Sequence, residues 1–534
     1  MSSLELLPFE VLSHLLCTSK QLNKARLLSK SFRYACNRNV KSIKWEDAKR
    51  IRDDDGEMDM YIRDASCFDL LTDLDVVTSM HMASCVETLA TIMKQSTRLE
   101  SARLKCDDPR TDGSSVAILC TGLEKLTRLT TLDLSGNGFG LSGAHNLAPT
   151  LKDLETLTTL LLDGNNFGAL GAEVLAPAIR KLVRITRLDL GHNDFGRDGV
   201  AALATSLKEL VKLTALHLGG NNLGTSGIAV LAETFDKLAE LKTLDIHENF
   251  GADDAGAIAT ALEKLPELRT LLLNQNDFGK AAAAALAPAL GNLVHLTRLD
   301  IGYNNFGKDG ATASLAHAFD KLVDLQELYI GFNNFGPSIE TLAPAIGKLG
   351  QLRTLDLGLN ELVDVGVPAL AHALGQLLEL TTLHLDSNHL GFGGADVSTA
   401  LASALEKLTK LKMLDIAWNR FGESGTAIIA PALGKLVNLE KLFLGSNQIH
   451  EHGAYALASA LGHLSELMTL DISDNGIGDD GARALAHPFG KLSKLISLDV
   501  SYNCSTEGEA VIASAVKNLV GLTTTFTRRE KNLQ

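Results

Sequence analysis

Aromatic residues, paired cysteines and long apolar segments are all scarce in this sequence, and each scarcity excludes a class of protein. Aromatic residues make up only 5% of the 534 residues, so a hydrophobic core must consist mostly of Leu, Ala, Val and Ile. No CxxC pair occurs, and the seven cysteines fit no zinc-binding spacing. An odd number of cysteines in so long a chain favours reduced thiols, and hence a cytoplasmic or nuclear protein.

Sequence signals for membrane insertion, secretion and catalysis are missing as well. No apolar run approaches the about 18–20 residues that span a bilayer, and the first ten residues lack the basic segment of a secretory signal. None of the patterns GxxxxGKS/T, HExxH or GxSxG occurs, and the acidic residues are spread too evenly to single out a catalytic pair. We therefore expect a protein without enzymatic activity, cofactor or metal.

The charge is unevenly divided along the chain. Residues 1–52 contain eleven Lys and Arg but only four Asp and Glu, while the whole chain has a net charge of −14, so the remainder is strongly acidic. An acidic body argues against binding to nucleic acid. The contrast between a basic beginning and an acidic body indicates that the two parts contact different partners.

One sequence unit, LxxLxLxxN, recurs along most of the chain and dominates its organisation. Successive units are mostly 28 residues apart, with excursions to 27, 29 and, once, 31 residues. Fourteen units are present, and their asparagines are Asn137, Asn165, Asn193, Asn221, Asn249, Asn276, Asn304, Asn333, Asn360, Asn388, Asn419, Asn447, Asn475 and Asn503.

Each part of the unit has a physical role. The alternating leucines of a short strand face one side, so parallel stacking of successive strands would join them into one core. The asparagine follows the strand, where a buried amide can bond backbone groups of adjacent coils. Glycines such as Gly140 and Gly143 suit the next turn, and a stretch such as 171–182 is apolar on one helical face. Prolines such as Pro149 and Pro177 should kink these helices or shorten them from their N-terminal ends.

No single unit can bury its leucine face alone, so the units must stack into a solenoid. On these residues, the sequence over about 121–526 resembles the leucine-rich repeat family, and specifically its ribonuclease-inhibitor-like class. The resemblance implies an α/β fold, a leucine-rich-repeat solenoid of horseshoe shape with a parallel sheet on the concave face and helices outside. It also implies that the chain holds a protein partner.

The two ends of the repeat array are expected to be caps. Strand-like segments at 41–45, 74–79 and 99–106 indicate degenerate units around an acidic loop at 52–59, and 523–527 is expected to be a last strand. The expected organisation is therefore a helical segment at 1–45, capping repeats at 46–120, fourteen repeats with a C-terminal cap at 121–526, and a tail at 527–534.

The beginning of the chain resembles a second family. The segments LPFEVLSHLL and LSKSF resemble the F-box pattern over about residues 4–45, although the connection between them is short and Gln21 stands where an acidic residue is usual. The resemblance implies a Skp-type adaptor as partner, and it implies that the adaptor-binding residues are Leu7, Pro8, Glu10, Val11, Leu12, Leu15, Leu16, Leu28 and Phe32. The alternative is a helical cap over the first repeat.

In each unit, the residue between the last two leucines points away from the core. Asp occupies this position in every second unit over most of the chain, which indicates a doubled repeat. These aspartates either attract a basic partner or recur because the unit was copied, with the carboxylates bonded to the backbone. Exposed aromatic residues are typical binding anchors. The candidate partner-binding residues of the concave face are Asp189, Asp245, Asp300, Tyr303, Tyr329, Phe332, Asp356, Trp418 and Phe443.

Three functions fit these patterns. The F-box-like beginning favours a substrate-recognition subunit of a Skp–cullin–F-box ubiquitin ligase. The repeats also resemble those of Ran GTPase-activating proteins, regulators of a small GTPase, although that family normally starts directly with repeats and ends in an acidic tail. A non-enzymatic scaffold or inhibitor of a basic ligand is the third. The 31-residue step, around 391–400, either forms a contact loop or is drift.

Overall fold

The computed structural model describes residues 42–46, 71–78, 83–106, 113–307, 311–363 and 365–527, and the chain divides into two compact units between Ile246 and His247. The F-box-like residues Leu7 to Phe32 and the acidic segment 52–59 lie outside the described residues, so the predictions for them stay predictions.

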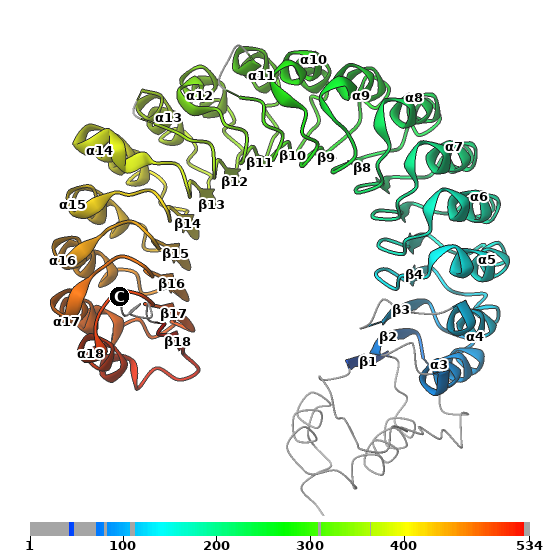
Figure 1. Ribbon diagram of the computed structural model, residues 1–534, viewed down its shortest axis with the longest axis horizontal. Coiled ribbons are helices and arrows are strands. Elements are labelled where there is room, and N and C mark those ends of the chain that lie inside the picture. Colours follow the sequence, from blue (N-terminus) through cyan, green and yellow to red (C-terminus); the bar gives the residue numbers. More distant parts are fainter. Residues whose placement is uncertain are drawn as a thin grey trace, which may run out of the picture. The chain divides into compact units, whose positions relative to one another are not determined.

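The first unit is a parallel sheet covered on one side by helices (Figure 1). Each described strand pairs in parallel with the next one along the chain. The strands are β1 (Ser42–Glu46), β2 (Asp73–Thr78), β3 (Ser101–Cys106), β4 (Thr131–Asp133), β5 (Thr159–Leu161), β6 (Arg187–Asp189), β7 (Ala215–His217) and β8 (Thr243–Asp245). The helices are α3 (Ala83–Gln95), α4 (Gly113–Leu123), α5 (Gly140–Leu151), α6 (Gly168–Ile179), α7 (Gly196–Leu207) and α8 (Gly224–Phe235).

The second unit repeats the same arrangement, again with sequential parallel pairing. Its described strands are β9 (Thr270–Leu272), β10 (Arg298–Asp300), β11 (Glu327–Tyr329), β12 (Thr354–Asp356), β13 (Thr382–His384), β14 (Met413–Asp415), β15 (Lys441–Phe443), β16 (Thr469–Asp471), β17 (Ser497–Asp499) and β18 (Thr523–Thr525). Its helices are α9 (Ala255–Leu262), α10 (Gly279–Asn292), α11 (Ala311–Phe319), α12 (Ile339–Gly347), α13 (Val367–Leu374), α14 (Gly394–Leu405), α15 (Gly422–Leu433), α16 (His450–Leu461), α17 (Gly478–Phe489) and α18 (Thr506–Val516). Short 3-10 turns, η2 (Ala252–Asp254), η3 (Gly336–Ser338) and η4 (Leu390–Gly393), precede α9, α12 and α14.

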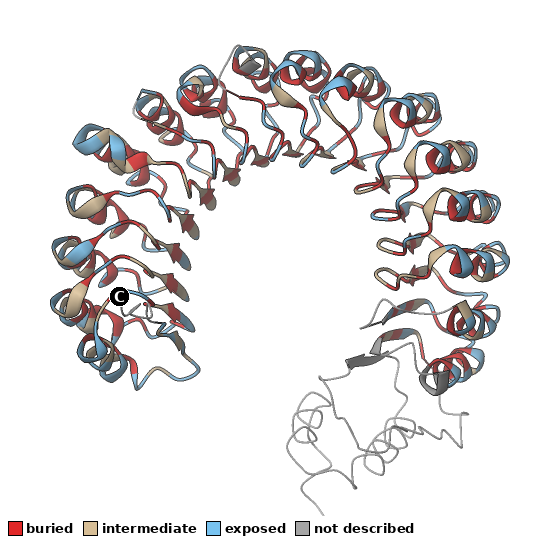
Figure 2. Ribbon diagram, viewed as in Figure 1, coloured by how far each residue is buried: buried red, intermediate tan, exposed pale blue. Residues whose placement is uncertain are grey.

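The predicted solenoid architecture is confirmed within each unit. One strand, from β4 to β17, belongs to each of the fourteen predicted repeats, and β18 is the predicted last strand. The three strands expected before the repeats are β1, β2 and β3. Inside each unit, the strands line the concave side and the helices the convex side (Figure 1), and the helices turn their buried faces toward the strands (Figure 2).

The core consists of aligned leucines closed by a row of buried asparagine amides. Leu355 at the centre of β12, for example, is fully buried and lies in register with Leu328 and Leu383. Beside it, the Asn360 side chain donates to the carbonyls of Ile330 (2.9 Å) and Leu357 (3.1 Å), and its Oδ1 accepts from the N–H of Asn333 (3.0 Å). The predicted role of the asparagine, to bond backbone groups of adjacent coils, is confirmed.

Proline was predicted to kink or to shorten the helices, and shortening does not occur in α5 or α6, while the predicted kink stays a prediction. Pro149 lies inside α5 and Pro177 inside α6, and both helices have 12 residues, as does α7, which contains no proline. Each proline stands two residues before the helix ends. A helix of this length needs no further turn beyond the proline, so the proline does not shorten it. Within the described residues, no helix is long and apolar enough to cross a membrane.

Candidate binding surface on the concave face

The aspartates at the ends of the strands bond the backbone of their own coil. In the first unit, Asp189 Oδ1 accepts from the N–H of Gly191 at 3.1 Å. In the second unit, Asp300, Asp356 and Asp415 accept from the N–H two residues further on, at 3.1, 2.9 and 3.1 Å. The structural interpretation of the repeated Asp is therefore confirmed by these hydrogen bonds, which leave the second carboxylate oxygen of each side chain for other contacts.

Burial raises the pKa of each of these four carboxyl groups. It raises the pKa of Asp300 and of Asp415 to about 6, against the lowering effect of the hydrogen bond from the backbone. Burial also raises the pKa of Asp356 and, in the first unit, of Asp189. Asp245 is nearly withdrawn from the surface, since it is only 8% exposed and lies 3.4 Å from Nδ1 of His217.

The predicted aromatic residues fall into two groups. Tyr303 and Phe332 stack on each other, with ring centroids 3.9 Å apart and an interplanar angle of 15°. Tyr329 is half-buried at the end of β11: its hydroxyl donates to Glu327 at 3.2 Å and the Arg298 guanidinium lies 5.0 Å from its ring. Burial, followed by the charge of Glu327, raises the pKa of Tyr329 to about 12.

Phe443 is half-buried at the end of β15, and Trp418 is 62% exposed just after β14. Of the ring contacts among the predicted aromatic residues, the described structure contains only that between Tyr303 and Phe332. The predicted aromatic residues therefore lie on two separate pairs of coils, those of β10 and β11 and those of β14 and β15.

A backbone feature that the sequence analysis missed explains where the exposed residues stand. The residue directly before each repeat asparagine is left-handed: in the first unit φ is 47° to 72° at Gly136, Gly164, His192 and Gly220. In the second unit φ is 51° to 61° at Glu248, Gln275, Tyr303, Phe332, Leu359, Ser387, Trp418, Ser446, Asp474 and Tyr502. The sheet ladder holds this conformation, since the N–H of Tyr303, for example, donates to the carbonyl of Gly331 at 2.9 Å. The sequence signal was the glycine before three of the first asparagines.

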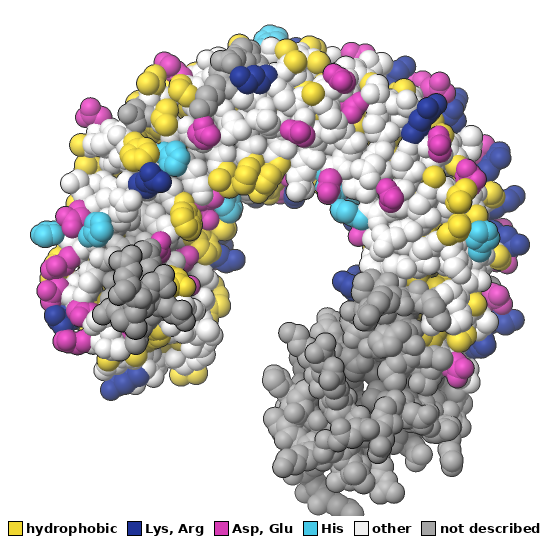
Figure 3. Space-filling model, viewed as in Figure 1, with side chains coloured by type: hydrophobic (Ala, Val, Ile, Leu, Met, Phe, Trp, Pro, Cys, Tyr) yellow, Lys and Arg dark blue, Asp and Glu magenta, His cyan; other side chains and the backbone are white. Residues whose placement is uncertain are grey.

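Five of these left-handed residues in the second unit are large, apolar or aromatic, and exposed. They are Tyr303 (50% exposed), Phe332 (38%), Leu359 (38%), Trp418 (62%) and Tyr502 (42%), and we call them the strand-end ridge. Hydrophobic side chains gather on the inner edge of this unit over β10 to β12 (Figure 3), which are the coils of the first three members of the ridge.

The longer 31-residue step is used for one additional turn. Its extra residues form η4 before α14, and Phe392 in that turn is 58% exposed, with the Arg420 guanidinium 5.1 Å from its ring. A cavity of about 350 Å³ adjoins this turn and is lined by Gly391, Gly394, Ala395, Phe421, Gly422, Glu423, Ser424 and Gly425.

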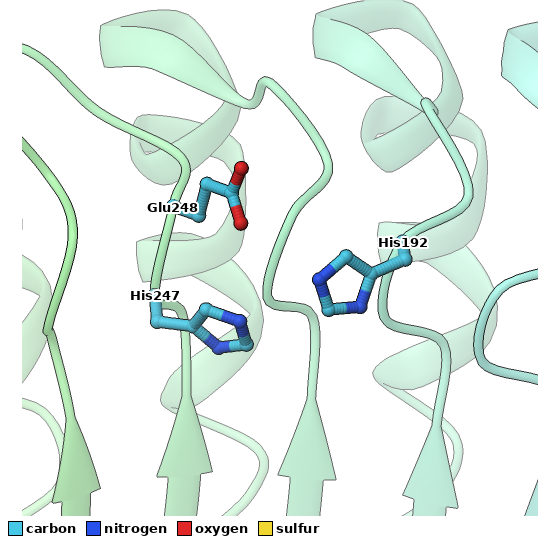
Figure 4. A group of neighbouring side chains, drawn as sticks. All are labelled: His192, His247 and Glu248. Atoms are coloured by element: carbon cyan, nitrogen blue, oxygen red, sulfur yellow. The ribbon is translucent and has the colours of Figure 1, made fainter. Parts of the chain in front are cut away.

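Metal-ligating side chains also meet on the concave side, a grouping that the sequence analysis did not anticipate. In the second unit, one ligand atom from each of His384, Asp386 and Asp415 lies within 4.8 Å of the others. In the first unit, His192 contacts Asp163 at 2.8 Å. Figure 4 draws His192, which belongs to the first unit, and His247 and Glu248, which follow β8 at the start of the second unit.

Comparison with known proteins identifies the repeat. A family model described as a leucine-rich repeat region matches residues 312–532, and a second leucine-rich repeat model matches residues 125–148, 185–204, 209–232 and 292–313. No curated protein matches the chain in sequence.

Among solved structures, the chain is similar to an internalin from Listeria monocytogenes, with 22% identity, 65% of this chain and 88% of that chain covered, and a TM-score of 0.44. A leucine-rich-repeat protein of Leptospira interrogans is similar at 18% identity, with 84% and 99% covered and a TM-score of 0.43. The sequence matches and the parallel strand–helix coils agree: the chain is a leucine-rich-repeat protein.

Proposed function

We propose that this protein is a binding module that holds a protein partner on the strand-end ridge of its second unit. The partner presents apolar side chains flanked by Lys or Arg. The observation that carries the proposal is that large apolar residues stand exposed at left-handed backbone positions, where the fold would be served better by glycine.

The energetic argument rests on the comparison of the two units. A left-handed conformation costs a non-glycine residue about 1–2 kcal/mol, and three of the four corresponding positions in the first unit are glycine. In the second unit the same position holds Tyr303, Phe332 and Trp418, and although Tyr303 and Phe332 stack on each other, the three side chains remain 50%, 38% and 62% exposed. Strain retained at exposed aromatic residues is typical of binding sites.

The charge beside the ridge favours a basic partner. The pKa of Tyr303 is raised by burial and then by the negative charges of Asp356, Asp386 and Asp300. A Lys or Arg side chain next to the apolar contact would be attracted by these carboxylates, and dissolved salt would weaken that attraction.

The test compares proteins captured by three versions of the full chain. The ridge variant carries Tyr303→Gly, Phe332→Gly and Leu359→Gly, which remove the side chains and suit the left-handed backbone. The matched control carries Val323→Ser, Leu378→Ser and Val437→Ser, three exposed apolar residues in turns between helix and strand. We expect proteins that bind the native chain and the control but bind the ridge variant at least about tenfold more weakly. Identical capture by all three chains would refute the proposal.

A second proposal concerns the beginning of the chain. The F-box-like pattern from Leu7 to Phe32 supports a role as the substrate-recognition subunit of a Skp–cullin–F-box ubiquitin ligase. Purified full-length chain is mixed with a Skp-type adaptor, and Leu12→Ala with Leu16→Ala serves as the interface variant. We expect binding that the double variant abolishes; a native chain that does not retain the adaptor would count against the role and favour a cap.

Two further candidate roles use the concave face of the repeats, and solution assays distinguish between them. For a regulator of a small GTPase, the chain would accelerate GTP hydrolysis by Ran, and the absence of acceleration removes this candidate. For a scaffold or inhibitor of a basic protein, binding would weaken as salt is raised, and binding unchanged at high salt would remove the electrostatic form of this role.

A further inference from the structure

One coil of the second unit carries metal-ligating side chains at two positions on the concave side. His384 ends β13 at the non-acidic position of the doubled repeat, between Asp356 of β12 and Asp415 of β14. Two residues later, Asp386 stands where the adjacent coils have Gly358 and Ala417. Neither the leucine core nor the asparagine row requires a ligand-bearing side chain at these places, so this coil carries chemistry that the fold does not need.

The side chains at these two positions lie close to a third metal-ligating group, the carboxylate of Asp415. His384 and Asp415 are register partners on β13 and β14, and Asp386 follows His384 on the same side of the chain. One ligand atom from each side chain lies within 4.8 Å of the others. Donor atoms around a tetrahedral zinc ion are ~3.4 Å apart for ligand bonds of 2.0–2.2 Å, a spacing that modest side-chain rotations would reach.

The neighbouring coil makes room for this arrangement. A Cβ added at Gly358 would lie 2.7 Å from Oδ1 of Asp386, so any larger residue there would displace the carboxylate. One oxygen of Asp415 is held by the N–H of Ala417 at 3.1 Å, which orients the carboxylate and leaves its other oxygen available. The carboxylate is thus positioned by backbone rather than by a flexible contact.

Negative charge accumulates here without a basic side chain to balance it. Among the described ion pairs, none joins Asp386 or Asp415 to Lys or Arg. The carboxylates of Asp386 and Asp415 lie within 4.8 Å of each other and repel when both are ionised. A divalent cation would relieve this repulsion. The imidazole of His384 would give the cation a nitrogen ligand, whereas a Lys or Arg side chain of a bound partner would not be coordinated by it.

We propose that His384, Asp386 and Asp415 bind one divalent transition-metal ion of the zinc class on the concave face of the second unit. One nitrogen and two oxygen donors favour Zn²⁺ or Co²⁺ over Ca²⁺ and Mg²⁺, which prefer oxygen ligands. The remaining coordination positions stay open to water or to a donor atom of a bound molecule. The site needs no partner protein to form, so its test does not depend on the role proposed for the strand-end ridge, although Asp386 is also one of the charges beside Tyr303.

The test uses the purified full-length chain and Zn²⁺ followed by calorimetry. His384→Gln, Asp386→Asn and Asp415→Asn each remove one ligand, and the matched control is His217→Gln in the first unit. His217 also ends its strand and has an aspartate, Asp245, as its register partner. Two residues after His217, however, the chain has Gly219, whereas Asp386 stands two residues after His384. We expect the three ligand variants to bind this ion about 100-fold more weakly or worse, and the control to bind as the native chain does.

Two further measurements distinguish metal binding at this site from metal binding by cysteines and from loss of folding in the variants. Co²⁺ at this site should quench the emission of Trp418, which follows Asp415 by three residues; Asp386→Asn and Trp418→Phe should both lose this quenching, while Trp418→Phe retains the calorimetric site. Without metal, Asp386→Asn should melt no lower than the native chain, since it removes repulsion between carboxylates. Native chain that shows neither Zn²⁺ binding nor Co²⁺ quenching, or ligand variants that bind Zn²⁺ like native chain, would overturn the metal site and leave the cluster as a negative surface for a basic partner.

Discussion

The left-handed position before the asparagine makes a prediction with an unusual sign. At Trp418 φ is 57°, and we compare Trp418→Gly with Trp418→Ala. Both variants lose the same indole contacts, so their difference isolates the backbone. In the alanine variant, the left-handed conformation lowers the free energy of unfolding by about 1–2 kcal/mol. In the glycine variant, the greater freedom of the unfolded chain lowers the free energy of unfolding by about 0.5–1 kcal/mol. The glycine variant should therefore be more stable by about 0.5–1 kcal/mol.

The measurement is urea unfolding followed by circular dichroism, with two controls. In the first unit, Gly136→Ala and Gly164→Ala place a Cβ no closer than 3.5 and 3.4 Å to its neighbours, so they add strain without a clash and should be destabilising by a similar amount. On the exposed side of α15, Ala427→Gly should be destabilising by about 1 kcal/mol. If the alanine variant at Trp418 equals or exceeds the glycine variant in stability, the backbone is not left-handed there and the strain argument fails.

Three other predictions follow from the concave face and the core. Asp300→Asn should stabilise the chain by about 1 kcal/mol at pH 7.5, after solvent screening, but not at pH 3.5. The pKa of Asp300 in the folded chain is about 6, above the ordinary 3.8, so the stability of the native chain falls as pH rises between these two values. Melting temperatures of both chains measured across this pH range would show the difference. Asn360→Ala leaves the Asn333 N–H without its acceptor, while the carbonyls of Ile330 and Leu357 each keep a second amide donor, from Asn333 and Asn388, so the variant should cost about 1–3 kcal/mol in urea unfolding; no measurable cost would contradict the buried amide row. Cys120, whose pKa burial raises to about 11, should resist alkylation at pH 8 until the chain unfolds, and rapid labelling of folded protein, detected by mass spectrometry, would contradict its burial.

The repeat predicted the solenoid because every coil carries its own instructions. Leucine alternation specifies a strand, and the buried amide of a residue such as Asn360 can be satisfied only by adjacent coils. These requirements are local and recur at short intervals, so the amino-acid sequence was sufficient to place the strands β4 to β17 and the last strand β18. The same reasoning named aromatic residues of the concave face as candidates, but it could not show which of them contact each other, because side-chain contacts between coils do not follow from spacing.

Proline shows where local rules mislead. Pro149 and Pro177 lie in the last turn of full-length helices, and only the observed helix ends show that the position is harmless. The burial of Asp245 is a similar case, since the alternating pattern marked it as outward-facing.

The sequence alone was sufficient for the repeat, the parallel sheet and the buried asparagine row, because each depends on residue types at fixed short spacings. The tertiary structure alone decided which side chains meet. Asp415 lies 31 residues from His384, and their pairing depends on the register of two strands and on the extra turn η4 between them. The left-handed strain at Tyr303 and Trp418 likewise arises from hydrogen bonds to the next coil, which no single repeat contains.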